Sequence, residues 1–370
     1  MKYSALARSA VAAVVVVNAS AASAFSFDAG NTQVSVGGYI KLEAMMTDYD
    51  GAPAATGLER IGRDFYVGPG SIPLDDGEGQ TVFDMHARQT RFNMKTVTDT
   101  GGEMLTGFLE LDFLVTDGGN EVVSNSYVPR LRHAFLSYGN WLFGQTWSTF
   151  QNVGALPDML EFIGPAESTI FVRQPLIRYS TGNVQVAIEN PQNTGFGGDT
   201  NDTPDIALRL NMGTFVLAGI IRSLQDEATD ERAVGGGVSF SGKVPLGRND
   251  IRFMLSAGSG IGRYLGVNAN PDGRIENGDI ETNDTVAGFV AYRQVWSDKA
   301  RSTMSLGYFA GDEDAGADAT ESAHSVIVNY IYSPQKNLDV GIELANFARE
   351  LNDGRDGGFR RVHFSARLGF

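Results

Sequence analysis

The sequence predicts an all-β fold, a transmembrane antiparallel β-barrel of about 16 strands with an inward constriction loop. Three observations lead to this prediction: the C-terminal strand, an export signal at the N-terminus, and alternating segments along the chain. From Val362 to Phe370, apolar and polar residues alternate, which is the period of a strand with one apolar face. A terminal strand that ends on an aromatic residue is typical of outer-membrane barrels, whose apolar band is edged by aromatic residues.

The N-terminus has the pattern of a secretory signal. A short basic region precedes the apolar run Ala10–Val17, which is too short to span a bilayer as a helix, and residues 22–24 form a small-x-small cleavage site. We therefore expect a signal peptide at 1–24 and a single barrel domain at 25–370, located in the outer membrane of a Gram-negative cell. An N-terminal anchor helix is the alternative, although no stop-transfer pattern follows.

Composition supports a barrel and limits the classes of function. The chain has no cysteine, and its mean hydropathy is slightly polar at −0.14. A barrel explains a polar average, because only alternate residues need to be apolar. The net charge of −15 makes nucleic acid an improbable partner. Acidic residues gather in the expected loops, which suits an outer surface within lipopolysaccharide, although plain solvation explains these loops equally well.

Sixteen segments have strand-like patterning, and their connections alternate in length. The expected strands are 34–48, 81–97, 103–114, 130–139, 140–147, 173–180, 184–190, 204–211, 214–222, 233–244, 250–259, 285–296, 300–310, 324–332, 338–347 and 359–370. Short connections such as Gly139-Asn140 have hairpin-turn chemistry. Long polar loops are expected at 49–79, 115–129, 191–203, 223–232, 260–284, 311–323 and 348–358. Short turns on one rim and long loops on the other are typical of transmembrane barrels.

The alternation also assigns faces. Residues such as Leu208, Leu255 and Ile342 are expected to face lipid, and their charged neighbours are expected to face the interior. The predicted inward charges are Glu110, Asp112, Arg209, Arg252, Arg293, Arg301, Asp339 and Glu343. Charges opposite leucines favour a wet interior, as in an open pore.

Segment 148–172 is the candidate constriction loop. It has no strand alternation, and its apolar content argues against disorder. We expect it to fold into the barrel and narrow the lumen. The alternative is an outer loop that covers the rim or grips a neighbouring subunit.

Arginines lie near this segment in the sequence. Arg130 and Arg132 share one face, whereas Arg173 and Arg178 differ in parity. Guanidinium groups bind carboxylates bidentately, and rings of arginine are the usual device of anion pores. We therefore predict a constriction that binds small anionic solutes, formed by Arg91, Arg130, Arg132, Arg173, Arg178, Asp158 and Glu161. A mixed-charge lumen with only mild selectivity is the alternative.

Catalysis and metal binding have little support. No Gly-x-Ser-x-Gly elbow is present. His133 and His324 are expected on the lipid face, where neither could act as the general base for a catalytic serine. The acidic run at 312–318 could offer oxygen ligands to Ca²⁺, but it lacks the closing glutamate of an EF-hand loop. We expect no enzyme activity, no cofactor and no metal. An adhesive or purely structural barrel remains as a third class.

Six stretches together resemble the DcaP-like outer-membrane porin family. They are Gly37–Glu43, Ala87–Phe92, Glu110–Phe113, Arg130–Phe135, Gly144–Phe150 and Arg173–Tyr179, and the resemblance is strongest over 34–190. The resemblance implies a homotrimer of sixteen-stranded barrels that passes small anions such as dicarboxylates by diffusion. One feature differs: some members carry a helical segment before the barrel, whereas here the first expected strand begins soon after the cleavage site. A weakly selective porin and a non-conducting barrel remain the alternatives.

Overall fold

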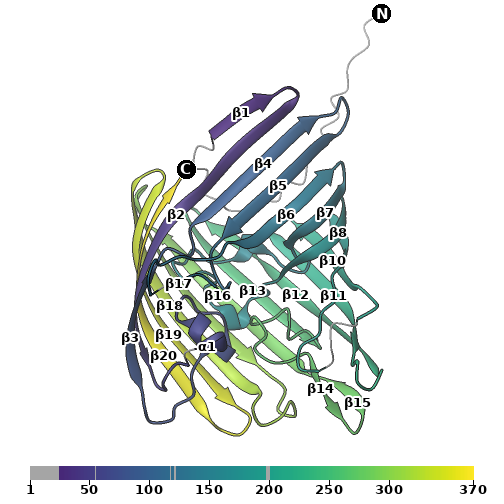
Figure 1. Ribbon diagram of the computed structural model, residues 1–370, viewed down its shortest axis with the longest axis vertical. Coiled ribbons are helices and arrows are strands. Elements are labelled where there is room, and N and C mark those ends of the chain that lie inside the picture. The colour runs from purple at the N-terminus through teal and green to yellow at the C-terminus, as the bar shows by residue number, and fades with distance from the viewer. Residues whose placement is uncertain (1–24, 55, 117, 121, 197–200) are drawn as a thin grey trace, which may run out of the picture.

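The computed structural model describes residues 25–54, 56–116, 118–120, 122–196 and 201–370. The predicted signal peptide, 1–24, lies outside the described residues. The chain forms a closed antiparallel β-barrel in which successive strands pair with each other and β2 (Thr32–Tyr49) pairs with β20 (Asp356–Gly369) to close the ring (Figure 1). The predicted fold class is confirmed.

Between these two strands, the wall follows the chain. Its other members are β1 (Phe25–Ala29), β3 (Gln80–His86), β4 (Arg91–Asp99), β5 (Met104–Asp112), β6 (Arg130–Tyr138), β7 (Trp141–Trp147), β8 (Arg173–Thr181), β9 (Val184–Glu189), β10 (Asp205–Met212), β11 (Phe215–Gln225), β12 (Arg232–Leu246), β13 (Asn249–Ser259), β16 (Asp284–Val295), β17 (Ala300–Ala310), β18 (Thr320–Gln335) and β19 (Leu338–Leu351). Smaller elements lie in the connections: α1 (Gly57–Gly62), η1 (Pro69–Ser71), η2 (Val153–Ala155), η3 (Ala166–Ser168) and the hairpin of β14 (Gly273–Glu276) with β15 (Asp279–Thr282).

The 18 strands of the sheet fill sixteen positions in the wall. The strands β3 and β4 share one position, beside one edge of β2, and β1 and β20 share another, beside the opposite edge. On one edge of β2, the stretch 32–39 pairs with β4 and the stretch 43–49 pairs with β3. On the other edge, β1 pairs with 32–36 and β20 pairs with 39–49. Gly38 lies at this change of partners with a φ of 150°, and a Cβ there would come within 2.0 Å of the Arg91 carbonyl oxygen. Only glycine fits such a close backbone approach.

Fifteen of the sixteen predicted strands form with changes only at their ends, whereas the predicted strand 81–97 is divided at 87–90 into β3 and β4. In segments that were expected to be loops or left unassigned, the structure adds β1, α1, the β14–β15 hairpin and the short helices η1, η2 and η3. The terminal strand pairs as its pattern predicted. Phe370 exchanges two backbone hydrogen bonds with Gly38, at 3.1 and 3.2 Å, and so helps to close the barrel.

The face assignments of the named apolar and charged residues are also confirmed, and the one exception, His133, is described with the site below. Leu208 is 53% exposed on the outer wall, and Leu255 and Ile342 are similar, whereas Glu110 and Glu343 are buried inside. Exposed aromatic residues flank the short turns, namely Tyr138, Trp141, Tyr292, Trp296 and Tyr332. Such a belt lies where a barrel meets the membrane–water interface. Among the described residues, no helix is long and apolar enough to cross a membrane.

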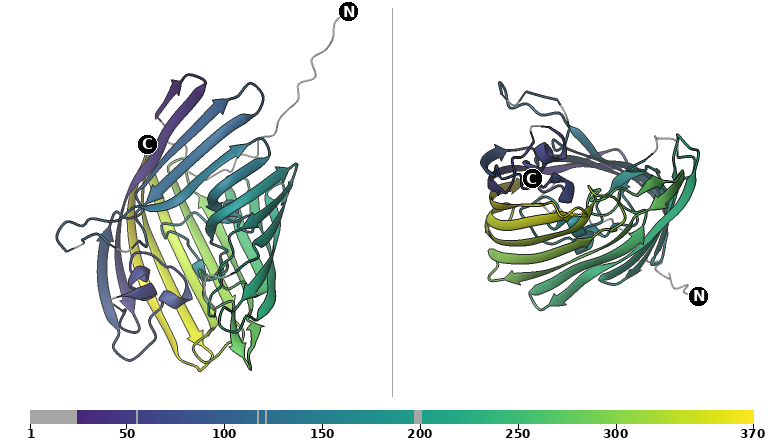
Figure 2. Two further views of the ribbon diagram at one scale, coloured as in Figure 1. Left: turned by 45° about the vertical axis from the view of Figure 1, so that its right-hand side comes forward. Right: turned by 90° about the horizontal axis from the view of Figure 1, so that it is seen from below.

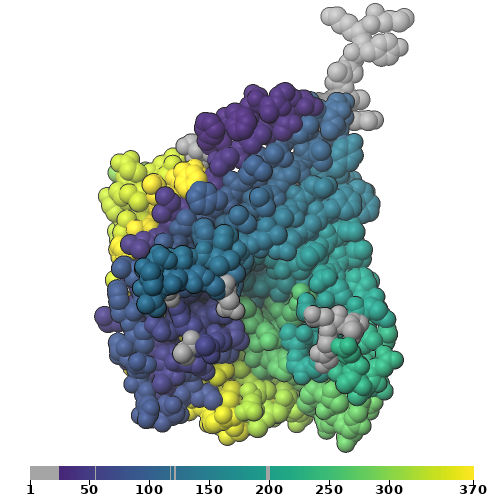
Figure 3. All heavy atoms as spheres, in the orientation of Figure 1, coloured from purple at the N-terminus to yellow at the C-terminus, as the bar shows by residue number. Residues whose placement is uncertain are grey.

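The interior of the barrel is partly filled by loops, as the end-on view shows (Figure 2). One apolar cluster joins Phe150, Ile170 and Tyr264 from connections to Phe289 and Phe309 from the wall. A second cluster joins residues of 65–72 and Ile163 to Phe347 and Phe359. The strands β1, β2 and β4 rise above the C-terminal strands at the rim of short turns, so this rim is uneven in height (Figure 3).

Candidate functional site

Residues 148–172, the inward segment, lie inside the barrel and contact strands around its circumference. At its start, Thr149 donates its backbone N–H to Glu189 Oε1 of β9, at 2.7 Å. Next to it, the carbonyl oxygen of Gln151 accepts a hydrogen bond of 2.6 Å from Arg209 of β10. Backbone groups inside a wide barrel need such partners, because a buried unpaired N–H or carbonyl is costly. Polar wall residues therefore hold the segment in the lumen.

The tip of the inward segment is held from the opposite wall. Glu343 of β19 accepts two hydrogen bonds of 2.8 Å, from the backbone N–H groups of Leu160 and Glu161. Lys41 of β2 donates to the carbonyl oxygen of Leu160, also at 2.8 Å. Arg361 of β20 lies 3.3 Å from the carboxylate of Glu161. Three charged side chains from neighbouring strands thus fix the position of the tip.

The last part of the segment docks through a buried carboxyl group. Glu167 in η3 is fully buried, and its Oε1 accepts a hydrogen bond of 2.6 Å from the Ser325 hydroxyl on β18. It lies against Gly307 of β17, where a Cβ would come within 1.9 Å of Glu167 Oε1. Burial without a cationic partner raises the pKa of the Glu167 carboxyl from 4.5 to about 7. Burial therefore favours the neutral form of this carboxyl, although the hydrogen bond from Ser325 works in the opposite direction.

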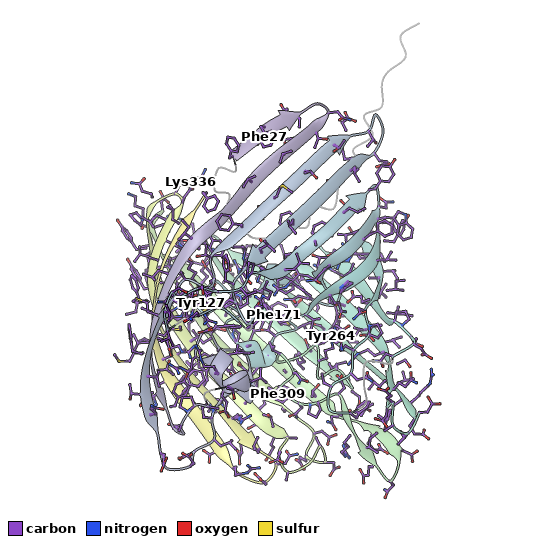
Figure 4. All side chains as sticks on the ribbon, in the orientation of Figure 1. Phe27, Tyr127, Phe171, Tyr264, Phe309 and Lys336 are labelled. Carbon is purple, nitrogen blue, oxygen red and sulfur yellow. The ribbon has the colours of Figure 1, made fainter. Side chains whose placement is uncertain are left out.

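A cavity of about 970 Å³ lies between the inward segment and the barrel wall and reaches the rim of short turns. Lys336, at that rim, and Phe171, inside the barrel, both line it (Figure 4). Its lining contains ten lysines and arginines but only five carboxylates. The cations are Lys41, Arg91, Arg132, Lys243, Arg252, Arg293, Lys299, Arg301, Lys336 and Arg367, and the carboxylates are Glu110, Asp158, Glu161, Asp298 and Asp339. The electrostatic balance of this space is strongly positive.

One wall of the cavity is formed by β4, β5 and β6. Arg132 donates to Glu110 at 2.8 Å and to Asp112 at 2.7 Å, and Arg130 binds Asp112 through two hydrogen bonds of 2.8 and 2.9 Å. Arg91 lies 3.6 Å from Glu110. We call these five residues the paired-arginine cluster. Its two carboxylates are almost fully buried, so three guanidinium groups share two fixed negative charges.

A β-bulge builds this cluster. Glu110 of β5 is opposite His133 of β6, but the next residue, Leu111, is opposite Leu131, so Arg132 is the extra residue. The bulge turns both Arg132 and His133 inward, where each is at most 2% exposed. The prediction that His133 faces lipid is therefore wrong, because strict alternation fails at a bulge. His324 does face outward.

The other predicted site residues take different places. Asp158 and Glu161 line the cavity, as do Arg91 and Arg132, whereas Arg130, Arg173 and Arg178 are not among the described lining residues. Arg173 stacks on the Trp147 ring, with its guanidinium carbon 4.5 Å from the ring centroid. Arg178 donates to the Thr149 hydroxyl and to the Trp147 carbonyl oxygen, and so supports the start of the inward segment.

A second basic wall was not predicted as part of the site, and only three of its residues, Arg252, Arg293 and Arg301, were predicted to face the interior. Five cations line the cavity here, and we call them the basic belt: Lys243 of β12, Arg252 of β13, Arg293 of β16, Arg301 of β17 and Arg367 of β20. Asp250 lies 2.5 Å from Arg293 and 2.8 Å from Arg252. Asp158 of the inward segment lies 2.7 Å from Arg301. Inward parity was the sequence signal for Arg252, Arg293 and Arg301, but it did not show that the five cations form one site.

In the described part of the chain, no group of three or more histidine, aspartate or glutamate side chains is arranged so that it could bind a metal ion. The polar groups of the cavity are instead guanidinium, ammonium and carboxylate groups in contact with open space. Such groups bind and orient charged solutes.

Comparisons with known proteins agree with this architecture. A sequence profile of the DcaP outer membrane protein family matches residues 15–370, so the chain belongs to this family. The outer membrane channel DcaP of Acinetobacter baumannii has a TM-score of 0.77 and 24% identity, over 93% of this chain and 99% of that one. The chain is therefore an outer-membrane porin-type barrel. A comparison with curated proteins found no significant match.

More distant porins share the fold. The anion-selective porin from Comamonas acidovorans has a TM-score of 0.58 and 12% identity, over 92% of this chain and all of that one. The trimer form of OmpT from Vibrio cholerae has a TM-score of 0.53 and 12% identity, with the same coverage. At these identities, the comparisons support only the barrel fold.

Proposed function

We propose that this member of the DcaP outer membrane protein family is a passive, anion-selective porin, rather than an enzyme, for small organic anions such as dicarboxylates. The supporting observation is the cavity, with ten lysines and arginines against five carboxylates in its lining. Inward cationic side chains at a narrow point select anions in pores of this kind. The inward segment supplies the narrow point, because it occupies the lumen beside this cavity.

Two other readings of the barrel are less well supported. A non-conducting structural barrel would fill its lumen, whereas the space beside the inward segment measures about 970 Å³. A weakly selective porin would balance its lining charges, whereas cations here outnumber carboxylates two to one. The distant fold neighbour from Comamonas acidovorans is described as anion-selective, which is compatible with the proposal.

We further propose that the chain acts as a homotrimer within outer-membrane lipid and lipopolysaccharide. The apolar outer wall requires a lipid or protein neighbour, since residues such as Leu208 and Leu255 are more than half exposed. A distant fold neighbour, OmpT of Vibrio cholerae, is described in a trimer form.

The test is the reversal potential of the refolded protein in a planar bilayer under a potassium chloride gradient. We expect the sign of an anion-selective channel, and a lower preference for chloride in Lys243→Gln, which removes a cation from the cavity lining. The matched control is Arg248→Gln, because Arg248 is 60% exposed at a turn and is absent from the described cavity lining. A cation-selective wild type would mean that the loop acids, or Asp158 and Glu161, control the pore. The absence of conductance would favour the non-conducting barrel.

A further inference from the structure

The contact between the inward segment and the basic belt has an unusual form. Asp158 Oδ2 lies between two guanidinium groups, 2.7 Å from Arg301 Nε and 3.8 Å from Arg293 Nη1. The other oxygen, Oδ1, makes no hydrogen bond to any residue that the structure describes. All three side chains are about a quarter exposed to the cavity, at 22–25%. A single carboxylate therefore occupies a wet position between two arginines that line the solute path.

The two arginines are held in place without Asp158. Arg301 also donates to the Ser333 hydroxyl at 2.9 Å and lies 3.4 Å from Asp339, which belongs to β19. Arg293 lies 2.5 Å from the buried carboxylate of Asp250 on β13. Its Nη1 lies 3.8 Å from Asp158, on the side of the cavity. Because the other partners belong to the wall, both guanidinium groups keep their positions when Asp158 leaves.

The Asp158 side chain can leave without moving the segment that carries it. Asn329 of β18 donates to the Asp158 carbonyl oxygen at 2.9 Å, and Glu343 holds the backbone N–H groups of the two residues at 160–161. Arg252 binds the carbonyl oxygen of Leu156 on the other side. Only the rotation of this partly exposed side chain is required, and rotations of side chains at the surface take picoseconds to nanoseconds.

We propose that Arg293 and Arg301 form a carboxylate-binding subsite in which Asp158 is an internal occupant, and that a carboxylate of a passing solute takes its place during transit. The exchange is a matter of binding alone, since one carboxylate replaces another on the same guanidinium donors. It rests on the proposed function, because it assigns a position to the solute that the porin passes. Asp158 then lowers the affinity of the subsite and keeps it from retaining solute, as conduction requires sites that release what they bind.

The test is succinate block of single-channel current at neutral pH, measured in the wild type and in Asp158→Asn. Asparagine keeps the size of the side chain but removes the competing charge, so the apparent affinity for succinate should rise about fivefold, as expected when an occupant that fills most of the subsite is removed. Adding Arg301→Gln to Asp158→Asn should abolish this gain. Single-channel openings of normal size in Asp158→Asn verify that the barrel is folded.

Asp298→Asn is the matched control. Asp298 lines the same cavity and loses the same charge, but it is 93% exposed and pairs with Arg248, outside the subsite. It should raise the succinate affinity by no more than twofold. Equal gains in the two variants would overturn the subsite, because they would reveal a general charge effect. Unchanged or weaker block in Asp158→Asn would also overturn it. A cation-selective wild type without succinate block would refute the proposed function itself, whereas block in the wild type without tightening in the variant refutes only the subsite.

Discussion

The two basic walls of the cavity differ in where their carboxylate partners are attached. In the paired-arginine cluster, Glu110 and Asp112 are buried on the strand next to the arginines, and Arg132 is itself only 2% exposed. In the basic belt, one partner of Arg301 comes from the inward segment, and both side chains are about a quarter exposed. The first wall is a closed network within the sheet, and the second wall shares its charges with the lumen.

This difference gives the paired-arginine cluster a mainly structural role and the basic belt a role in selectivity. Buried ion pairs fixed within one sheet contribute little free charge to a solute, because their fields largely cancel at a distance. Exposed pairs are weak and exchangeable, so their cations remain available to a solute anion. The arginines of the paired-arginine cluster are thus mainly structural. Those of the basic belt are better placed to bind solute.

The sharpest test of this comparison is stability. Arg132→Gln leaves Glu110 and Asp112 buried with one partner fewer, which should lower the free energy of unfolding by about 3–5 kcal/mol. Arg301→Gln breaks two partly exposed pairs, with Asp158 and Asp339, and should lower it by about 2 kcal/mol or less. Guanidinium unfolding in detergent, followed by tryptophan fluorescence, measures both. Similar losses in the two variants would show that the walls do not differ in this way.

The third attachment of the inward segment should give a pH dependence. The pKa of Glu167 is about 7 in the folded chain and 4.5 when exposed, so the folded state binds the proton more tightly. Stability is therefore full below pH 4.5 and falls as the pH rises to about 7, by about 3 kcal/mol for a shift of this size.

Glu167→Gln isolates this contribution, because glutamine keeps the Ser325 contact but does not titrate. The difference in unfolding free energy between the two proteins, measured from pH 4 to 9, should change with the slope of one proton between pH 4.5 and about 7 and level off above that range. A difference that stays constant with pH would mean that the Glu167 carboxyl does not titrate in this range.

The sequence predicted the wall well and the site only in part. Period-two patterning determines which residues face lipid, so strands and inward charges could be identified one segment at a time. The bulge at Arg132 could not, because it depends on the register between β5 and β6. The basic belt could not be recognised as one site, since its residues run from Lys243 to Arg367 and meet only when the barrel closes.

Glu343 tests whether the tip of the inward segment is as firmly held as the paired-arginine cluster. Glu343→Gln replaces an acceptor of two backbone N–H bonds with a group that can accept only one well, leaving a buried donor unpaired. This should lower the unfolding free energy by about 1–3 kcal/mol and increase the noise of the open-channel current. The matched control is Glu103→Gln at an exposed turn. Quiet, wild-type-like currents would show that other contacts suffice to hold the tip.

The smallest expected effect comes from a pair of lysines, one near each wall. Lys41 is buried beside Glu43 at 3.0 Å and holds the tip, whereas Lys243 is 37% exposed and lies 3.5 Å from Asp250. Lys243→Gln should change the unfolding free energy by less than about 0.5 kcal/mol yet reduce the chloride preference, because it removes a cation from the cavity lining. Lys41→Gln should do the reverse, with a clear loss of stability and a smaller change in reversal potential. If Lys243→Gln left the reversal potential unchanged, the basic belt would not control selectivity, and the single uncompensated positive charge of the paired-arginine cluster would have to do so.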